Sequence, residues 1–259
     1  MQLTMSNKKV IDCFLFYNEV KMLEFRLKEH YNYVDHFVIV ESNKSFTGKD
    51  KKYFFQENIH RYKEYLDKII YVKLNDNAQY QSAWDAEEFQ RNCISRGFDK
   101  LTLQDDDIIL ISDVDEILNV DIIPDLKSQD NLVLHSLEYD MYYYNMECYK
   151  PNAGWRFPKV ISYFNFRTNP NCHKLRLENT NFTKKAGWHF SYFGDPKSIS
   201  DKLSNFSHQE YNIPSINDIK LIEKQILEKK DLFGRDHAKI TPIKIENNKF
   251  LPKNYKFLN

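Results

Sequence analysis

One short run constrains this chain more than any other: Ile108-Ile-Leu-Ile-Ser-Asp-Val-Asp-Glu-Ile117. Four consecutive apolar β-forming residues predict a strand that is buried on both faces, as in a parallel sheet. Three carboxylates follow the strand directly, at Asp113, Asp115 and Glu116. Ligands of open α/β sheets bind just beyond the carboxyl ends of the strands. The run therefore predicts a ligand site at the end of a buried strand.

The spacing of the first two carboxylates favours a metal site. Asp113 and Asp115 are two residues apart, so in extended backbone their side chains share one face. Neighbouring carboxylates repel unless a cation neutralises them, and Mg²⁺ and Mn²⁺ prefer oxygen ligands. The pair thus predicts a divalent cation that holds a phosphorylated substrate. A polar loop after a strand is the commoner origin of a bare Asp-x-Asp, and only the buried strand before it favours the site.

The pattern along the chain predicts an α/β fold. Strands are expected at 10–16, 36–41, 68–72 and 108–111, with helical spacing at 18–31, 55–66 and 82–96 between them. Gly97 is expected to end the third helix. Residues 10–117 then read β-α-β-α-β-α-β, a nucleotide-binding layout. Beyond Pro124 the regular alternation of strands and helices ends. Strands are expected at 132–137, 141–144, 155–166 and 188–193, and helices at 198–210 and 216–230.

Because no segment is linker-like, the chain is predicted to form a single domain, 1–259. It comprises a nucleotide-binding half, 10–117, an acceptor and catalytic half, 118–235, and a C-terminal tail, 236–259.

Composition excludes several classes of protein. Lys+Arg and Asp+Glu are both 37, so no global positive field favours nucleic acid. The four cysteines show no C-x-x-C spacing, which argues against a zinc site and a disulfide scaffold and favours buried thiols. No stretch approaches the roughly 20 apolar residues of a membrane span. A soluble, cytoplasmic chain without a signal peptide is expected, although an anchor on a longer natural protein stays open.

Residues elsewhere suit a nucleotide-sugar donor. Glu41, at the tip of the second strand, is a candidate to accept hydrogen bonds from a base or ribose. Arg91 is a candidate for bidentate phosphate binding, the alternative being an ion pair with Glu88 on the helix surface. Lys49, Lys51 and Lys52 lie in a loop that either closes over phosphates or is simply solvated.

Histidines and aromatic residues of the second half have two interpretations each. His189 and His208 are candidates to complete the coordination of the metal, and a hydrogen-bonded core histidine is the alternative for His189. Trp155, Trp188 and Tyr192 are candidate platforms for sugar rings, although a lone aromatic residue is more often part of the core.

Several blocks together resemble glycosyltransferase family 17, whose best-known members are β-1,4-mannosyl-glycoprotein 4-β-N-acetylglucosaminyltransferases. They run in family order over roughly residues 10–235. The matching blocks are 12–19 (Asp-Cys-Phe-Leu-Phe-Tyr-Asn-Glu), Arg26-Leu27, 34–42, Thr47-Gly48 with Lys51, 67–70, Glu88 with Arg91-Asn92, 109–117, 186–193 (Ala-Gly-Trp-His-Phe-Ser-Tyr-Phe) and Phe206-Ser-His208.

The resemblance implies a GT-A-type fold, a UDP-sugar donor, UDP-N-acetylglucosamine first, a divalent cation (Mn²⁺ or Mg²⁺) and inversion at the anomeric carbon. Inversion requires one in-line displacement with a carboxylate as base and no covalent glycosyl-enzyme. The candidate donor-binding residues are Phe16, Asn18, Glu19, Glu41, Lys51, Arg91, Asn92, Asp113 and Trp188. The candidate metal ligands are Asp113, Asp115, His189 and His208. The candidate bases are Glu116, Asp195 and Glu210, with Glu138 and Asp140 as alternatives; Glu116 is alternatively a contact to the donor sugar.

The resemblance has two gaps. Well-known family members carry an N-terminal membrane anchor, which is not expected within residues 1–259. Residues 125–185 match poorly, so the acceptor glycan and the linkage stay open. A sugar-phosphate nucleotidyltransferase is the second hypothesis, against which the absence of glycine in 14–19 counts. A non-catalytic glycan-binding module is the third. Oligomeric state has no signal in the sequence.

Overall fold

The computed structural model of the chain describes residues 7–75, 79–235 and 238–258. Parts of the polar N-terminus, of the connection 74–82 and of the predicted tail 236–259 lie outside the described residues.

The elements of the first half follow the predicted order. In the second half, the strands expected at 132–137 and 141–144 form one strand, 135–143. The strand expected at 155–166 is instead a short strand, 159–162, followed by a helix, 163–168, because Ser162 accepts from the Asn165 N–H and caps that helix. The strands are β1 (Val10–Leu15), β2 (His36–Ser42), β3 (Ile69–Leu74), β4 (Ile108–Ile111), β5 (Glu116–Leu118), β6 (His135–Tyr143), β7 (Cys148–Trp155), β8 (Lys159–Ser162), β9 (Phe182–Ser191) and β10 (Thr241–Pro242). The α-helices are α1 (Val20–His30), α2 (Phe54–Glu57), α3 (Ala83–Asn92), α4 (Ser95–Phe98), α5 (Ile123–Ser128), α6 (Tyr163–Thr168), α7 (Cys172–Leu177), α8 (Pro196–Asn205) and α9 (Ile219–Leu227). Short 3-10 helices lie at Ile59–Arg61, Lys63–Lys68, Val120–Ile122, Gln209–Tyr211, Ile245–Asn247 and Tyr255–Phe257.

The central sheet is parallel in its first half and mixed in its second. Strands β3, β2, β1 and β4 pair in parallel, in that order. Antiparallel β8 continues the sheet to β6, β7 and β10, and β9 pairs with β6 in parallel and with β5 antiparallel. The carboxyl ends of β1, β2 and β4 therefore meet at one edge. The predicted α/β class, with a mixed second half, is confirmed.

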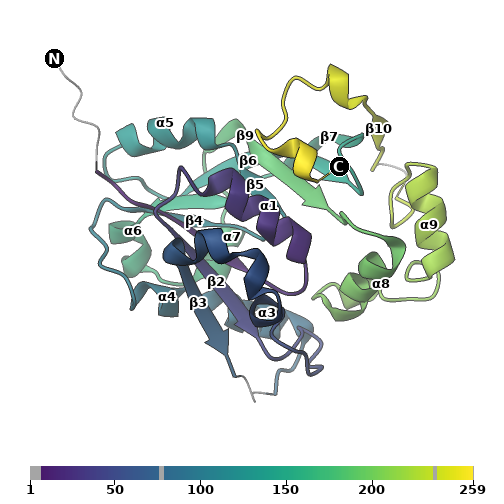
Figure 1. The fold of residues 1–259 in the computed structure, drawn as a ribbon, viewed down its shortest axis with the longest axis horizontal. Helices are drawn as coiled ribbons and strands as arrows, with labels where there is room; N and C mark the ends of the chain where they lie inside the picture. The colour runs from purple at the N-terminus through teal and green to yellow at the C-terminus, as the bar shows by residue number, and fades with distance from the viewer. Residues whose placement is uncertain (1–6, 76–78, 236–237, 259) are drawn as a thin grey trace.

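Helices cover both faces of the parallel strands (Figure 1). Alternate residues of β1, β2 and β4 point to opposite faces. One set packs with apolar residues of α1, α2 and α5, and the other with residues of α3, α4, α6 and α7. All four cysteines are buried thiols outside any disulfide bond, as predicted. None of the helices in the described part of the chain is long and apolar enough to cross a membrane.

Two predicted helices differ from the structure. The helix expected over 55–66 is one α-turn followed by 3-10 helices. The helix expected to end at Gly97 ends at Asn92, and Gly97 lies within α4 instead. A Cβ on Gly97 would lie 2.4 Å from Val38 Cγ1, so glycine is required there by the close approach of α4 to β2.

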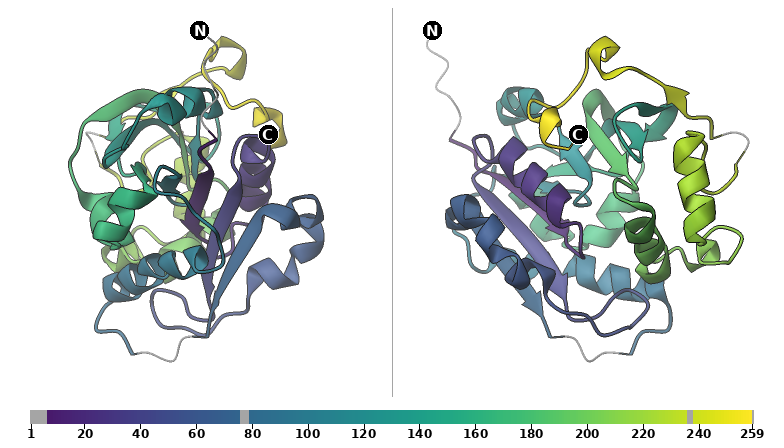
Figure 2. Two further views of the ribbon diagram at one scale, coloured as in Figure 1. Left: turned by 90° about the vertical axis from the view of Figure 1, so that its left-hand side faces the viewer. Right: turned by 45° about the vertical axis from the view of Figure 1, so that its right-hand side comes forward.

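The second half and the tail build the other end of the molecule. Figure 2 shows α8 and α9 together, and the C-terminal segment beside α1 and β9. Phe250, Phe257 and neighbouring apolar residues of this segment pack with Phe25 of α1 and Trp188 of β9. The buried Glu29 carboxylate accepts hydrogen bonds from the backbone N–H groups of Lys253 and Asn254. The tail is thus fixed to the core.

Gly187 controls the contact between β9 and β5. A Cβ at this position would lie 2.2 Å from the Ile117 carbonyl oxygen and 2.7 Å from the Tyr139 ring. Backbone cannot yield as a flexible side chain does, so we expect Gly187→Ala to destabilise the fold by about 1–3 kcal/mol, the usual cost of overpacking. Urea unfolding of the variant beside wild type measures this difference in stability. Equal stability of Gly187→Ala and wild type would contradict the close packing.

Candidate active site

The loop that carries the three carboxylates joins β4 to β5 and is held from below by Arg26. This arginine of α1 is completely buried. Its Nη1 donates to the carbonyl oxygens of Asp113, at 2.6 Å, and of Glu116, at 2.8 Å, and its Nη2 donates to Ser112 Oγ at 2.6 Å. One buried guanidinium therefore fixes the backbone of the whole loop.

Asp12 of β1 balances the charge of Arg26. It accepts from Arg26 Nε at 3.0 Å and contacts His30 Nδ1 at 2.8 Å. Burial alone would raise the pKa of Asp12, but the Arg26 charge and the His30 hydrogen bond lower it to about 2.

This pKa predicts a specific acid sensitivity. A carboxyl whose folded pKa is depressed contributes stability above its unfolded pKa, and that contribution is lost as the pH falls through the folded pKa. We expect the stability gap between wild type and Asp12→Asn to narrow by about 2 kcal/mol between about pH 5 and about pH 2. Urea unfolding across this range measures the gap, with exposed Asp106→Asn as control. A gap that does not change with pH would contradict the assignment.

Asp113 is held by two arginines. Arg91 Nη1 of α3 lies 2.7 Å from Asp113 Oδ1, and Arg176 Nη2 of α7 lies 2.5 Å from Asp113 Oδ2. Against the effect of burial, Arg176 and then Arg91 lower the pKa of Asp113 to about 2. Arg91 also pairs with Glu87, at 2.6 Å, and not with Glu88 as the surface alternative supposed.

The Asp115 carboxylate contacts other cations than the Asp113 carboxylate does. Lys202 Nζ of α8 lies 2.9 Å from Asp115 Oδ2, and His189 Nε2 of β9 lies 3.6 Å from Asp115 Oδ1. Burial would raise the pKa of Asp115, and the charges of Lys202 and His189 hold it far below the usual range. Val114 and Asp115 form a turn, so the extended spacing assumed from the sequence does not apply.

Glu116 is a completely buried positioning residue. Both oxygens accept from Arg176, at 2.7 and 2.6 Å, and Trp155 Nε1 donates to Oε1 at 2.6 Å. The backbone N–H of Asp113 donates to Oε2 at 2.6 Å. The carboxylate thus orients Arg176 and Trp155 from beneath the cavity and does not line it.

A cavity of about 570 Å³ lies beyond the carboxyl ends of β1 and β4. Both Trp155 and Tyr192, two of the three predicted sugar platforms, line it. The predicted site residues that line it are Phe16, Glu19, Lys51, Arg91, Asp113, Asp115, His189 and His208. These residues come from both halves of the chain, so the two halves share one site.

The other predicted donor-binding residues do not line this cavity. Asn18 lines a second cavity of about 360 Å³ next to it. The oxygens of buried Glu41 accept from Lys51, Tyr71 and the N–H groups of Phe54 and Phe55, so this residue holds the lysine loop.

Asn92 and Trp188 also have partners within the fold. Asn92 Oδ1 accepts from the His173 N–H and so positions α7, and Trp188 Nε1 donates to the Phe250 carbonyl oxygen in the tail core.

The remaining candidate bases are bound elsewhere too. Asp195 is exposed and caps α8 by accepting from the Ser198 N–H, and Glu210 pairs with His208 at 2.6 Å. The carboxylates of Glu138 and Asp140 pair with Arg156 and Lys185.

Sequence reasoning missed two cations of the site, Arg176 and Lys202. A lone arginine in a short helix and a lysine in an amphipathic one read as surface residues. Neither belongs to a local pattern that marks a site.

The predicted metal ligands do not converge. Asp113 is engaged by two guanidinium groups, Asp115 by Lys202 and His189, and His208 by Glu210 and the Trp84 ring. Within residues 7–75, 79–235 and 238–258, no three His, Cys, Asp or Glu side chains gather where they could hold a metal ion. The donor set therefore does not fit a divalent cation bound by Asp113 and Asp115 together.

The fold is of the GT-A type: parallel strands lie in the order 3-2-1-4, a carboxylate loop follows β4, and the mixed half completes a cavity at this edge. The sequence model of glycosyltransferase family 17 matches residues 1–238. The chain belongs to glycosyltransferase family 17, which confirms the resemblance seen in the sequence.

Solved structures with a similar arrangement are distant in sequence. HddC from Yersinia pseudotuberculosis is 9% identical with a TM-score of 0.36, covering 72% of this chain and 89% of its own. Galactosyltransferase LgtC, solved with donor and acceptor sugar analogues, is 15% identical with a TM-score of 0.35 over 64% of this chain and 61% of its own. Glucosyl-3-phosphoglycerate synthase from Mycobacterium tuberculosis, solved with Mn²⁺, UDP and phosphoglyceric acid, is 11% identical with a TM-score of 0.37 over 86% and 78%. No curated protein sequence matches the chain.

Proposed function

We propose that the chain is an inverting glycosyltransferase that moves a sugar, N-acetylglucosamine first among the candidates, from a UDP-sugar to a glycan acceptor. The observation that carries this proposal is the cavity at the carboxyl ends of the parallel strands. Basic and aromatic side chains line this cavity together. Family membership supports glycosyl transfer, and the donor sugar and the acceptor remain predictions.

The basic side chains suit a diphosphate. Arg91, Arg176 and Lys202 all line the cavity around the carboxylate loop. Lys51 lines it from the loop after β2, where Glu41 holds it at 2.8 Å. A guanidinium group can bind two phosphate oxygens at once through two parallel hydrogen bonds. Positive charges that are already in place stabilise a leaving diphosphate.

Aromatic side chains suit sugar rings. Trp155 lies against His189 with ring centroids 4.2 Å apart, and Tyr143 and Tyr192 meet edge to face at 5.6 Å. All four residues line the cavity. Flat apolar faces with a few polar tips are the usual lining of a site for a small ligand.

Transfer with inversion is a single displacement. The acceptor hydroxyl oxygen bonds to the anomeric carbon as the bond from that carbon to the diphosphate oxygen breaks, and the hydroxyl proton passes to a base. The carboxylates that line the cavity are Glu19, Glu87, Asp113 and Asp115. None of the predicted bases, Glu116, Asp195 or Glu210, is among them. Their assignment as bases stays a prediction.

A panel of UDP-sugars tests the function. We expect release of UDP from one UDP-sugar, faster in the presence of an acceptor glycan. Release of pyrophosphate from a nucleoside triphosphate and a sugar phosphate would instead identify a nucleotidyltransferase. Glycan binding with no turnover and no UDP affinity would identify a binding module. Either of the last two results overturns the proposal.

A further inference from the structure

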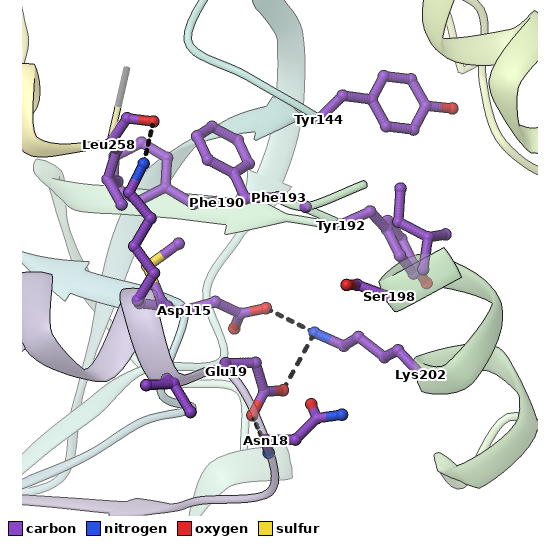
Figure 3. A pocket seen from close by; sticks show the side chains of 15 residues that line it. Asn18, Glu19, Asp115, Tyr144, Phe190, Tyr192, Phe193, Ser198, Lys202 and Leu258 are labelled. Atoms are coloured by element: carbon purple, nitrogen blue, oxygen red, sulfur yellow. Dashed lines mark hydrogen bonds and ion pairs between the residues drawn. The ribbon is translucent and has the colours of Figure 1, made fainter. Parts of the chain in front are cut away.

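Lys202 lies between two carboxylates of the site. Its Nζ lies 2.9 Å from Asp115 Oδ2 and 3.7 Å from Glu19 Oε1. Figure 3 shows the side chain reaching from α8 to these two carboxylates, which come from different loops. A single ammonium therefore joins the loop after β1 to the loop after β4.

The ammonium also faces the space where ligands bind. Lys202, Glu19, Asp115 and Tyr192 line both the cavity of about 570 Å³ and the neighbouring cavity of about 360 Å³. The Lys202 side chain is 26% exposed. An ion pair that served only to stabilise α8 would not need to stand at the junction of two cavities.

The other carboxylate leaves little place for a divalent ion. Both oxygens of Asp113 are bound by guanidinium groups, which do not lose their protons. A metal ion beside Asp113 would sit against two permanent positive charges. The cation that the carboxylate loop does bind with an exposed face is Lys202.

We propose that the Lys202 ammonium supplies the positive charge that balances the departing diphosphate, so that sugar transfer proceeds without a divalent cation. The inference rests on the proposed function. In the displacement, the electron pair of the broken bond goes to the terminal diphosphate oxygen of UDP, and Lys202, with Arg91 and Arg176, stabilises the charge that develops there. No redox partner is involved, and the proton of the acceptor hydroxyl passes to a base.

The experiment uses the full chain in the presence of EDTA. UDP affinity is measured by calorimetry and turnover by UDP release, each with EDTA or with added Mn²⁺. The variants are Lys202→Met, which removes the charge at similar length, and Lys202→Arg, which keeps it. Lys197→Met is the control, because Lys197 lies on the same helix and is exposed.

We expect wild type to bind UDP and turn over in EDTA, with Mn²⁺ changing either by less than about 3-fold. Lys202→Met should weaken UDP binding by about 10-fold, which is the loss of affinity expected when one hydrogen bond to a charged group is removed. It should lower turnover by about 10²-fold. Lys202→Arg should restore most of the UDP affinity, and Lys197→Met should behave as wild type.

Several results would overturn the inference. Loss of UDP binding by wild type in EDTA with recovery in Mn²⁺ does so, and this result leaves the transferase function intact. The inference is also overturned if Lys202→Met binds UDP as tightly as wild type but melts at a lower temperature, because the ion pair of Lys202 is then only structural. If wild type neither binds UDP nor turns over in either condition, the result contradicts the proposed function itself.

Discussion

Asp115→Ala is expected to lower sugar-transfer turnover by about 10³-fold, the effect of losing a principal electrostatic element of an active site. Asp115 holds the Lys202 ammonium at 2.9 Å and faces His189 Nε2 at 3.6 Å. Without the carboxylate, Lys202 is no longer fixed between the two loops, and two basic groups face each other without their anion. Turnover measured at saturating donor separates this effect from a change in donor affinity.

The matched control is Asp106→Ala, an exposed aspartate just before β4. It should retain wild-type turnover. Folding of Asp115→Ala is checked by its urea transition, because truncating one partner of a buried ion pair also destabilises. A folded Asp115→Ala protein with near wild-type turnover would remove the carboxylate loop from the catalytic centre.

The strand, the carboxylate loop and the helix that carry the site could be predicted from the sequence because they depend on local patterns. A run of β-forming residues that is buried on both faces leads directly into Asp113 and Asp115, and α/β topology places such a loop at a ligand site. Arg91 was found in the same way, on a helix that was expected from its local spacing and that Ser82 caps. Each of these signals lies within about ten residues of chain.

The parts that could not be predicted depend on pairs distant in sequence. Arg176 lies 63 residues from Asp113, and Lys202 lies 87 residues from Asp115. No period or motif records which distant cation will meet a carboxylate. The same holds for Glu41, whose oxygens are filled by groups that the loop after β2 brings back to it.

Trp188 shows how the face of a strand stays ambiguous. Residues 188–193 were predicted as a strand with alternating aromatic residues, and alternation divides them into two sets without saying which set faces the site. In the structure His189 and Ser191 line the cavity, and Trp188 and Phe190 pack in the core beneath the tail. The choice is made by the pairing of β9 with β5 and β6, which is tertiary information.

Arg26→Met is expected to have the largest effect on stability. It removes the charge partner of buried Asp12 and the donors to Ser112 and to two loop carbonyl oxygens. Breaking a buried ion pair costs about 3–5 kcal/mol, because the remaining charge stays buried without its partner. For a chain of this size that corresponds to a melting temperature lower by about 10 °C. UDP affinity should fall as well, because the carboxylate loop loses its support.

Two further variants distinguish the effect of the Arg26 hydrogen bonds from the effect of removing a positive charge. Arg61→Met removes an exposed pair with Glu24 of the same helix α1, with side chains 40% and 22% exposed, and should change stability by less than about 1 kcal/mol. Arg26→Lys keeps the charge but offers three donors on one nitrogen instead of five on a planar guanidinium, so its melting temperature should lie between those of wild type and Arg26→Met. If Arg26→Met melts within about 2 °C of wild type, a shift that corresponds to less than about 1 kcal/mol, the loop is held by something other than this guanidinium.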